Sequence, residues 1–231
     1  TNKNKVQNDI APNINQEKIV KKISRKDALS EVDRVIIENE KVIGSISLKG
    51  AIFDDLSFKN YKKDLKSNEN VVLLNPKDIE DGYYIESGWA SVGDEVEVPG
   101  ADSLWQVKGN RVLSEKNNVV LEWNNEKGLI FKKTIKLDDK YLFKIKQEVK
   151  NNTSSKINLY PYSQITRNKK PDDVMGFYIL HEGFIGVFDG ELKEDDYDDI
   201  QEKKIIRNSD NGWLGITDKY WVTAIVPPKD K

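Results

Sequence analysis

The sequence predicts an all-β protein, a large antiparallel β domain with few short helices. Between Asn118 and Arg167, apolar and polar side chains alternate with a period of two, which is typical of strands that bury one face and expose the other. Runs of Asn, Asp, Gly and Ser separate the alternating segments, as expected for turns. Because such a sheet cannot leave its apolar face in water, the rest of the chain must supply a second layer.

Length and composition favour one folded domain, which we expect to span residues 32–231. The chain has 231 residues, of which 37% are hydrophobic and 33% charged, and a chain of this length can bury a sizeable core. Its 37 basic and 39 acidic residues give a formal net charge of −2, which argues against nucleic-acid binding. The sequence has no cysteine, which excludes disulfides and thiolate chemistry. It also has no apolar run long enough to span a membrane, and no initiator Met or signal peptide, so we expect a processed chain or an excised domain.

Residues 1–31 are rich in Asn, Lys and Gln and poor in apolar side chains. This composition predicts a flexible tether. The alternative is a transient amphipathic helix between Gln16 and Leu29.

Residues 33–58 have the pattern of strands with a bend at Gly50. Asp54 and Asp55 follow as adjacent carboxylates, a pair that acid–base chemistry could use. We favour a turn between two strands, because Asp is a turn residue and adjacent strand positions point to opposite faces.

Four large aromatic residues lie between the first strands and residue 118. They could line a cleft that binds sugars or peptides, but packing in the core is the more common role of large aromatics in a β-sandwich. These candidate binding residues are Tyr83, Tyr84, Trp89 and Trp105.

The stretch from Asn118 to Arg167 is predicted to form four consecutive strands. Their sequences are NVVLEW, GLIFKKTIKL, KYLFKIKQEV and KINLYPYSQITR. In the second, Leu129, Phe131, Ile135 and Leu137 share one face. We expect these strands to form one wall of the sandwich.

The last third of the chain predicts further strands. GFIGVFDG (183–190) reads as a strand, and the acidic run ELKEDDYDDIQEKK (191–204), which lacks EF-hand spacing, reads as a solvated loop or short surface helix. GWLGITDKYWVTAIVP (212–227) predicts a terminal hairpin. Its aromatic residues Trp213, Tyr220 and Trp221 are expected to have a structural role, with both tryptophans packed in the core.

The sequence offers little for catalysis. His181 is the only histidine, so a site that needs two is impossible, and no nucleophile elbow, phosphate-binding loop, dinucleotide fingerprint or zinc-protease motif occurs. A hydrolase that uses carboxylates alone stays open. We expect a non-enzymatic protein without metal or cofactor.

Several blocks in order resemble a known family. GSISLKGAIFDDLSFKNY, GLIFKKTIKLDDKYLFKIKQEVKN and GWLGITDKYWVTAIVP, together with VVLLNP, YYIESGWAS and VPGADSLWQV, are similar to the periplasmic domain of the bacterial membrane protein insertase YidC, over approximately residues 34–228. The resemblance implies a β-supersandwich similar to galactose mutarotase. It also implies a periplasmic location and anchoring in the inner membrane by helices outside this chain.

The same resemblance implies an accessory, non-catalytic role in membrane protein insertion. The implied partners are accessory membrane proteins of the Sec translocon and nascent membrane proteins. The alternative is a carbohydrate-binding or carbohydrate-active β-sandwich, although mutarotases use several histidines and this chain has one. A third possibility is a spacer that only positions other parts of the protein.

Overall fold

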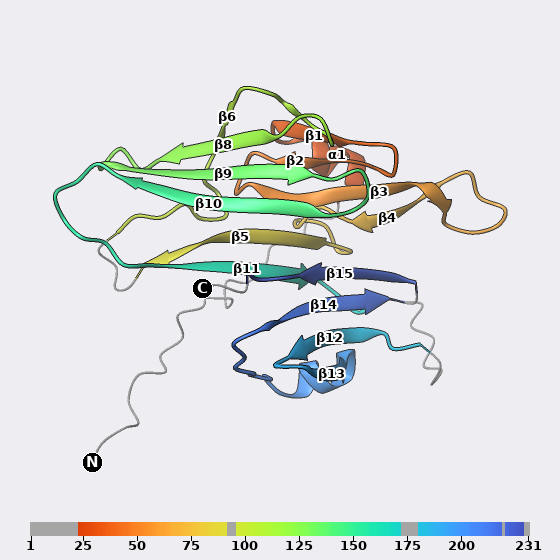
Figure 1. Cartoon of the computed structure of the whole chain (residues 1–231). Helices are drawn as coiled ribbons and strands as arrows, with labels where there is room; N and C mark the ends of the chain where they lie inside the picture. Colours follow the sequence, from red (N-terminus) through yellow and green to blue (C-terminus); the bar gives the residue numbers. More distant parts are fainter. Residues whose placement is uncertain (1–22, 92–95, 172–179, 219, 229–231) are drawn as a thin grey trace, which may run out of the picture. The chain divides into compact units, whose positions relative to one another are not determined.

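The computed structural model describes residues 23–91, 96–171, 180–218 and 220–228 (Figure 1). The fold is all-β, as predicted, with two short helices among the described residues. The chain divides into two compact units, residues 1–163 and 164–231, where the sequence analysis expects one domain.

The first described element is a helix inside the predicted tether. Helix α1 (Arg25–Ser30) begins after Ser24, whose side chain accepts a hydrogen bond from the backbone N–H of Asp27. Ala28 is buried, and Arg25 forms an ion pair with Asp55. The folded part of the chain therefore begins no later than Ser24, ahead of the predicted boundary after residue 31, because α1 is docked rather than transient.

The larger sheet has seven strands, in the order β11-β5-β3-β2-β1-β7 with β4 also paired to β3. All the pairs described among β1 to β5 are antiparallel, whereas β1 and β7 run parallel. The strands are β1 (Arg34–Glu38), β2 (Val42–Ser47), β3 (Ile52–Lys62), β4 (Asn70–Leu74), β5 (Tyr83–Ser91), β7 (Val112–Leu113) and β11 (Leu159–Arg167).

A four-stranded antiparallel sheet, in the order β10-β9-β8-β6, forms the second layer of the first unit. Its strands are β6 (Gln106–Lys108), β8 (Val119–Asn124), β9 (Leu129–Leu137) and β10 (Phe143–Asn151). The predicted meander is confirmed for β8, β9 and β10. Its fourth strand was wrongly assigned to this wall, because β11 belongs to the seven-stranded sheet; the longer connection between β10 and β11 lets the chain change layers.

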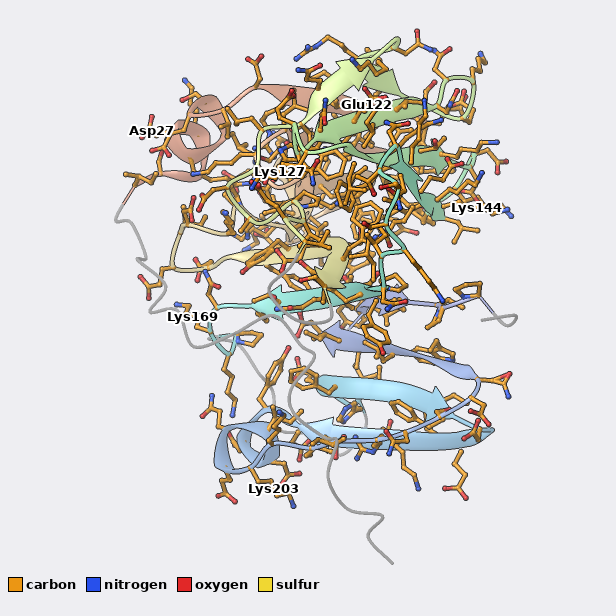
Figure 2. The ribbon with its side chains drawn as sticks, turned by 90° about the vertical axis from the view of Figure 1, so that its left-hand side faces the viewer. Asp27, Glu122, Lys127, Lys144, Lys169 and Lys203 are labelled. Atoms are coloured by element: carbon orange, nitrogen blue, oxygen red, sulfur yellow. The ribbon has the colours of Figure 1, made fainter. Side chains whose placement is uncertain are left out.

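The core of the first unit lies between these two sheets. Phe53 of β3 meets Phe143 of β10 edge to face, with ring centroids 5.5 Å apart. Figure 1 shows β8, β9 and β10 lying over the sheet that contains β1, β2 and β3. In the side view of Figure 2, the labelled Glu122 of β8 and Lys144 of β10 lie at the outer surface of the smaller sheet. The fully buried apolar side chains include Val35, Ile37, Ile46, Leu113, Leu121, Phe131 and Ile135.

The second unit contains a four-stranded antiparallel sheet in the order β13-β12-β14-β15. Its elements are β12 (Gly183–Phe188), β13 (Glu191–Asp196), α2 (Tyr197–Glu202), β14 (Gly212–Asp218) and β15 (Trp221–Ile225). The predicted strand at 183–190 and the terminal hairpin are confirmed. The acidic run is not a loop: its first part pairs with β12 as β13, and only its second part forms the expected short helix.

Candidate functional site

The four aromatic residues predicted as a possible cleft lie in the core of the first unit. Tyr83, Tyr84 and Trp89 belong to β5, and Trp105 directly precedes β6; none is more than 6% exposed. The rings of Trp89 and Trp105 are stacked with centroids 6.4 Å apart. Trp89 also meets Phe131 of β9 edge to face at 5.1 Å. Rings packed in this way stabilise the sandwich and present no open platform to a sugar or peptide.

Lys133 lies in the same aromatic core, and the sequence analysis missed it. This lysine is on the inward face of β9, between Phe131 and Ile135, and is only 2% exposed. Its Nζ donates a hydrogen bond of 2.6 Å to the backbone oxygen of Ser87 and lies 4.8 Å from the centre of the Trp105 ring. The signal was present in the sequence, because Lys133 is in phase with the apolar positions of its strand.

The environment of Lys133 disfavours its charge. Burial lowers the pKa of Lys133 to about 7, and the nearby Glu86 carboxylate opposes part of that decrease. A second inward polar side chain, Gln147 of β10, donates a 2.8 Å hydrogen bond to the backbone oxygen of Gly88. Two adjacent carbonyl groups of β5 are thus satisfied by side chains from the opposite sheet, which ties the layers together.

Asp54 and Asp55 form the second polar cluster. The proposed turn was wrong, because both residues lie inside β3. The β2–β3 register pairs Ser45 with Asp55 and Ile46 with Phe53, so Asp54 is the extra residue of a β-bulge. A bulge changes the alternation of side chains, which brings both carboxylates to the same group of partners.

These partners form a continuous network beneath α1. Arg34 pairs with Asp54 and donates from Nε to the Ser45 hydroxyl at 2.6 Å, and that hydroxyl donates to Asp55 at 2.6 Å. Arg25 pairs with Asp55, so the network fastens α1 to the sheet. Burial raises the pKa of Asp54, while its attraction to Arg34 works against the increase.

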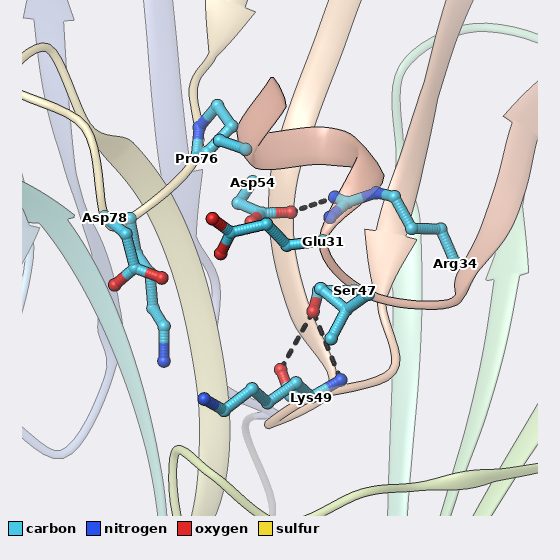
Figure 3. Close-up of a pocket in the computed structure, with 10 residues that line it drawn as sticks. Glu31, Arg34, Ser47, Lys49, Asp54, Pro76 and Asp78 are labelled. Carbon is cyan, nitrogen blue, oxygen red and sulfur yellow. Dashed lines mark hydrogen bonds and ion pairs between the residues drawn. The ribbon is translucent and has the colours of Figure 1, made fainter. Parts of the chain in front are cut away.

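A small pocket of about 130 Å³ adjoins this network (Figure 3). Its lining mixes three basic and three acidic side chains: Arg34, Lys49, Lys77, Glu31, Asp54 and Asp78. In Figure 3, Asp54 faces Arg34, and Ser47 bonds the backbone of Lys49. Lys49 also pairs with Asp102 at 2.7 Å, which raises the pKa of Lys49 and lowers that of Asp102. The pocket has room for a few water molecules or one small polar group, and its paired charges suit structural roles.

The terminal hairpin is less buried than predicted. Trp213 and Trp221 are half-buried, so they cover the sheet of the second unit without reaching a sealed core. Tyr220 is 77% exposed at the turn, where its ring adds little to the packing of the hairpin. A structural role for Tyr220 in the hairpin stays a prediction.

The described residues contain no cluster of three or more His, Cys, Asp or Glu side chains that could hold a metal ion. His181 lies in the loop before β12, where its Nε2 is 2.9 Å from the backbone oxygen of Phe184 and its Nδ1 3.6 Å from Asp196. Within the part of the chain that the structure describes, no helix is both long and apolar enough to cross a membrane.

Comparison with known proteins places these features in a family. The family model of the YidC periplasmic domain matches residues 34–231. The membrane protein insertase YidC of Pelagibacter ubique (strain HTCC1062) is 48% identical over 229 residues, which cover 99% of this chain and 41% of that protein. The insertase YidC of Methylorubrum extorquens (strain PA1) is 40% identical over 223 residues, covering 90% of this chain and 35% of its own length.

A third relative, the insertase YidC of Jannaschia sp. (strain CCS1), is 38% identical over 216 residues, or 88% of this chain and 34% of that protein. The chain thus spans about two fifths or less of the length of these relatives. The match to the family model covers both compact units and begins at the first strand of the sandwich. The chain therefore belongs to the family of YidC periplasmic domains.

Proposed function

We propose that this chain is a non-catalytic, periplasmic accessory domain of a membrane protein insertase. In this role it contacts accessory membrane proteins of the Sec translocon and nascent membrane proteins, and helices outside the chain anchor it in the inner membrane. The observation that carries the proposal is the family match over residues 34–231, together with relatives named as membrane protein insertases.

The arrangement of polar groups supports a binding role over a catalytic one. Lys133 and Asp54, whose pKa values burial shifts, are already hydrogen-bonded or ion-paired within the fold. A catalytic acid or base must reach a substrate, and neither group has that access. Lys133 instead joins the two sheets, and Asp54 binds Arg34 in the network that fastens α1 through Asp55. Such contacts give the domain a fixed shape, which a binding surface needs.

Crosslinking in the full-length protein tests this proposal. Photoreactive residues at exposed positions of each unit, such as Ile36, Tyr160 and Val222, are expected to capture Sec accessory proteins or nascent chains during insertion. Because residues 34–231 carry the photoreactive positions, a version that lacks them is compared with the unaltered protein by co-purification of the same partners and by insertion of a client. Contact with those partners that is unchanged by the deletion would contradict an accessory binding role, and normal insertion as well would favour a spacer.

The carbohydrate alternative depends on the four aromatic residues. Because Tyr83, Tyr84, Trp89 and Trp105 are buried, none of them offers a ring face to a sugar in this conformation. Calorimetric titration with a panel of sugars separates the two functions. We expect no heat of binding, and saturable heat with any member of the panel would revive the carbohydrate interpretation.

A further inference from the structure

The outer face of the four-stranded sheet in the first unit is basic. Residues across from each other in neighbouring strands share a face, so the register of β6, β8, β9 and β10 places six lysines and only two glutamates, Glu122 and Glu148, on this side. The whole chain, by contrast, has a formal net charge of −2. Figure 2 shows Lys144 at the outer surface of the sheet. We call this the basic face; its lysines are Lys108, Lys132, Lys136, Lys144, Lys146 and Lys150.

The two glutamates neutralise only part of the basic face. Glu122 pairs with Lys108 at 3.4 Å, and Glu148 pairs with Lys146 at 2.8 Å and with Lys132 at 3.8 Å. The remaining three lysines are exposed and have no ion-pair partner among the residues that the structure describes. The face therefore keeps an excess of positive charge after its own ion pairs have formed.

Two of these unpaired lysines, Lys136 of β9 and Lys144 of β10, lie directly across from each other. Like charges in that position repel and destabilise a sheet. Asp138, at the adjoining turn, forms no ion pair with either amine; its Oδ1 accepts hydrogen bonds of 2.9 Å from the backbone N–H groups of Lys140 and Leu142. The pair thus costs stability in the domain alone, and an anionic partner would offset that cost.

The extent and the rim of the basic face indicate which anionic partner it fits. Lys144 and Lys150 are about 20 Å apart along β10, at about 3.4 Å per residue, so one small anion cannot reach all the amines. At one end of the face, Tyr141 and Leu142 are 44% and 50% exposed, and the Tyr141 ring packs edge to face on Phe58 at 5.7 Å. Exposed tyrosine and leucine beside lysines are typical of surfaces that lie in the headgroup region of a bilayer.

We propose that the basic face docks on the surface of a bilayer that contains anionic phospholipid. The amines lie along the phosphate groups of the lipids, while Tyr141 and Leu142 enter the interfacial region. The inference rests on the part of the proposed function that anchors the domain next to a membrane, and it goes further by assigning the face that contacts lipid. Such a contact fixes the orientation of the first unit on the membrane.

Flotation of the full chain with lipid vesicles tests the proposal directly. The vesicles consist of phosphatidylcholine alone or of phosphatidylcholine mixed with phosphatidylglycerol. We expect the chain to bind the vesicles that contain phosphatidylglycerol at least about tenfold more tightly. This preference should shrink as salt is added, because salt screens the attraction between exposed charges.

A pair of matched variants locates the site. Lys136→Gln combined with Lys144→Gln is expected to weaken binding to the anionic vesicles at least about tenfold, since each lysine near such a surface contributes about fivefold. The control combines Lys26→Gln with Lys203→Gln, which remove the same charge from exposed lysines in α1 and directly after α2, and is expected to bind like the unaltered chain. Leu142→Ser is expected to weaken binding roughly threefold at every salt concentration, because it removes apolar contact. Thermal unfolding verifies that each variant remains folded.

Equal binding to both kinds of vesicle, or an equal loss in the two double variants, would overturn the proposal. Binding of poly-glutamate, but of no vesicle, that disappears when Lys136 and Lys144 are replaced would assign the face to an acidic protein instead. Failure of vesicle binding alongside intact crosslinking to Sec accessory proteins would remove this inference alone. Loss of the crosslinks with vesicle binding intact would remove the proposed partners alone.

Discussion

Replacing Lys133 by Met should change how the stability of the first unit depends on pH. The folded protein holds the ammonium group in a core where it is 2% exposed, and burial lowers its pKa to about 7 from an ordinary value of 10.5. Between these values the unfolded chain binds more protons than the folded chain. Stability therefore rises as the pH increases from about 7 towards 10.5, and this group contributes no slope below pH 7.

The size of the effect follows from the same two values. One group that titrates only in the unfolded state contributes a slope of at most about 1.4 kcal/mol per pH unit. Over the whole window the gain is up to about 5 kcal/mol. Met fills a similar volume but cannot donate to the backbone oxygen of Ser87, a loss of about 1–3 kcal/mol. The free energy of unfolding of Lys133→Met, relative to that of the unaltered protein, should therefore be highest below pH 7 and lowest near pH 10.

Urea unfolding followed by tryptophan fluorescence, repeated at several pH values from below 7 to 10, measures this dependence. Lys136→Met is the matched control, because Lys136 lies on the exposed face of the same strand. The free energy of unfolding of the control should change with pH as it does in the unaltered protein. The reasoning would be refuted if Lys133→Met showed that same pH dependence, or if its stability relative to the unaltered protein increased with rising pH.

Three further substitutions test the packing and the ion pairs. Arg34→Leu leaves the buried Asp54 carboxylate without its cation and should lower the free energy of unfolding in urea by about 3–5 kcal/mol. Adding Asp54→Leu should recover much of this loss. Equal stability of the single and double variants would contradict the prediction. Gly44→Val should cost at least about 2 kcal/mol, because a Cβ there overlaps the backbone oxygen of Asp55; unchanged melting would refute that contact. Trp221→Ala should cost about 1–2 kcal/mol, less than the about 3–5 kcal/mol of a core aromatic, and a larger loss would show that the ring is sealed.

Regular alternation was the part of the fold that could be predicted. In β9 every second residue is buried, and in β8 Val119 and Leu121 are, so the sequence pattern identifies both strands and their inner face. Lys133 obeys the same period, although a lysine is rarely fully buried. A charged residue in phase with an apolar face is better read as a buried group that needs a partner.

The polar cluster beneath α1 could not be derived in this way. Its geometry depends on one extra residue in β3, and only pairing with β2 defines that bulge. Adjacent carboxylates alternate sides in a regular strand, so period-two reasoning separates Asp54 from Asp55. Arg25 reaches the cluster from a helix distant in sequence, and no local pattern indicates that contact.

The two strands of the terminal hairpin have apolar residues on both faces. GWLGITD and WVTAI are apolar at successive positions, so both faces of this hairpin would be predicted to be buried. Their register with β12 shows that one face does bury Ile216 and Thr223, whereas the other leaves Val222 and Ala224 in contact with solvent. Local packing thus explains half of the apolar pattern. The exposed half is typical of an interaction surface, which the order of apolar residues along the strands cannot reveal.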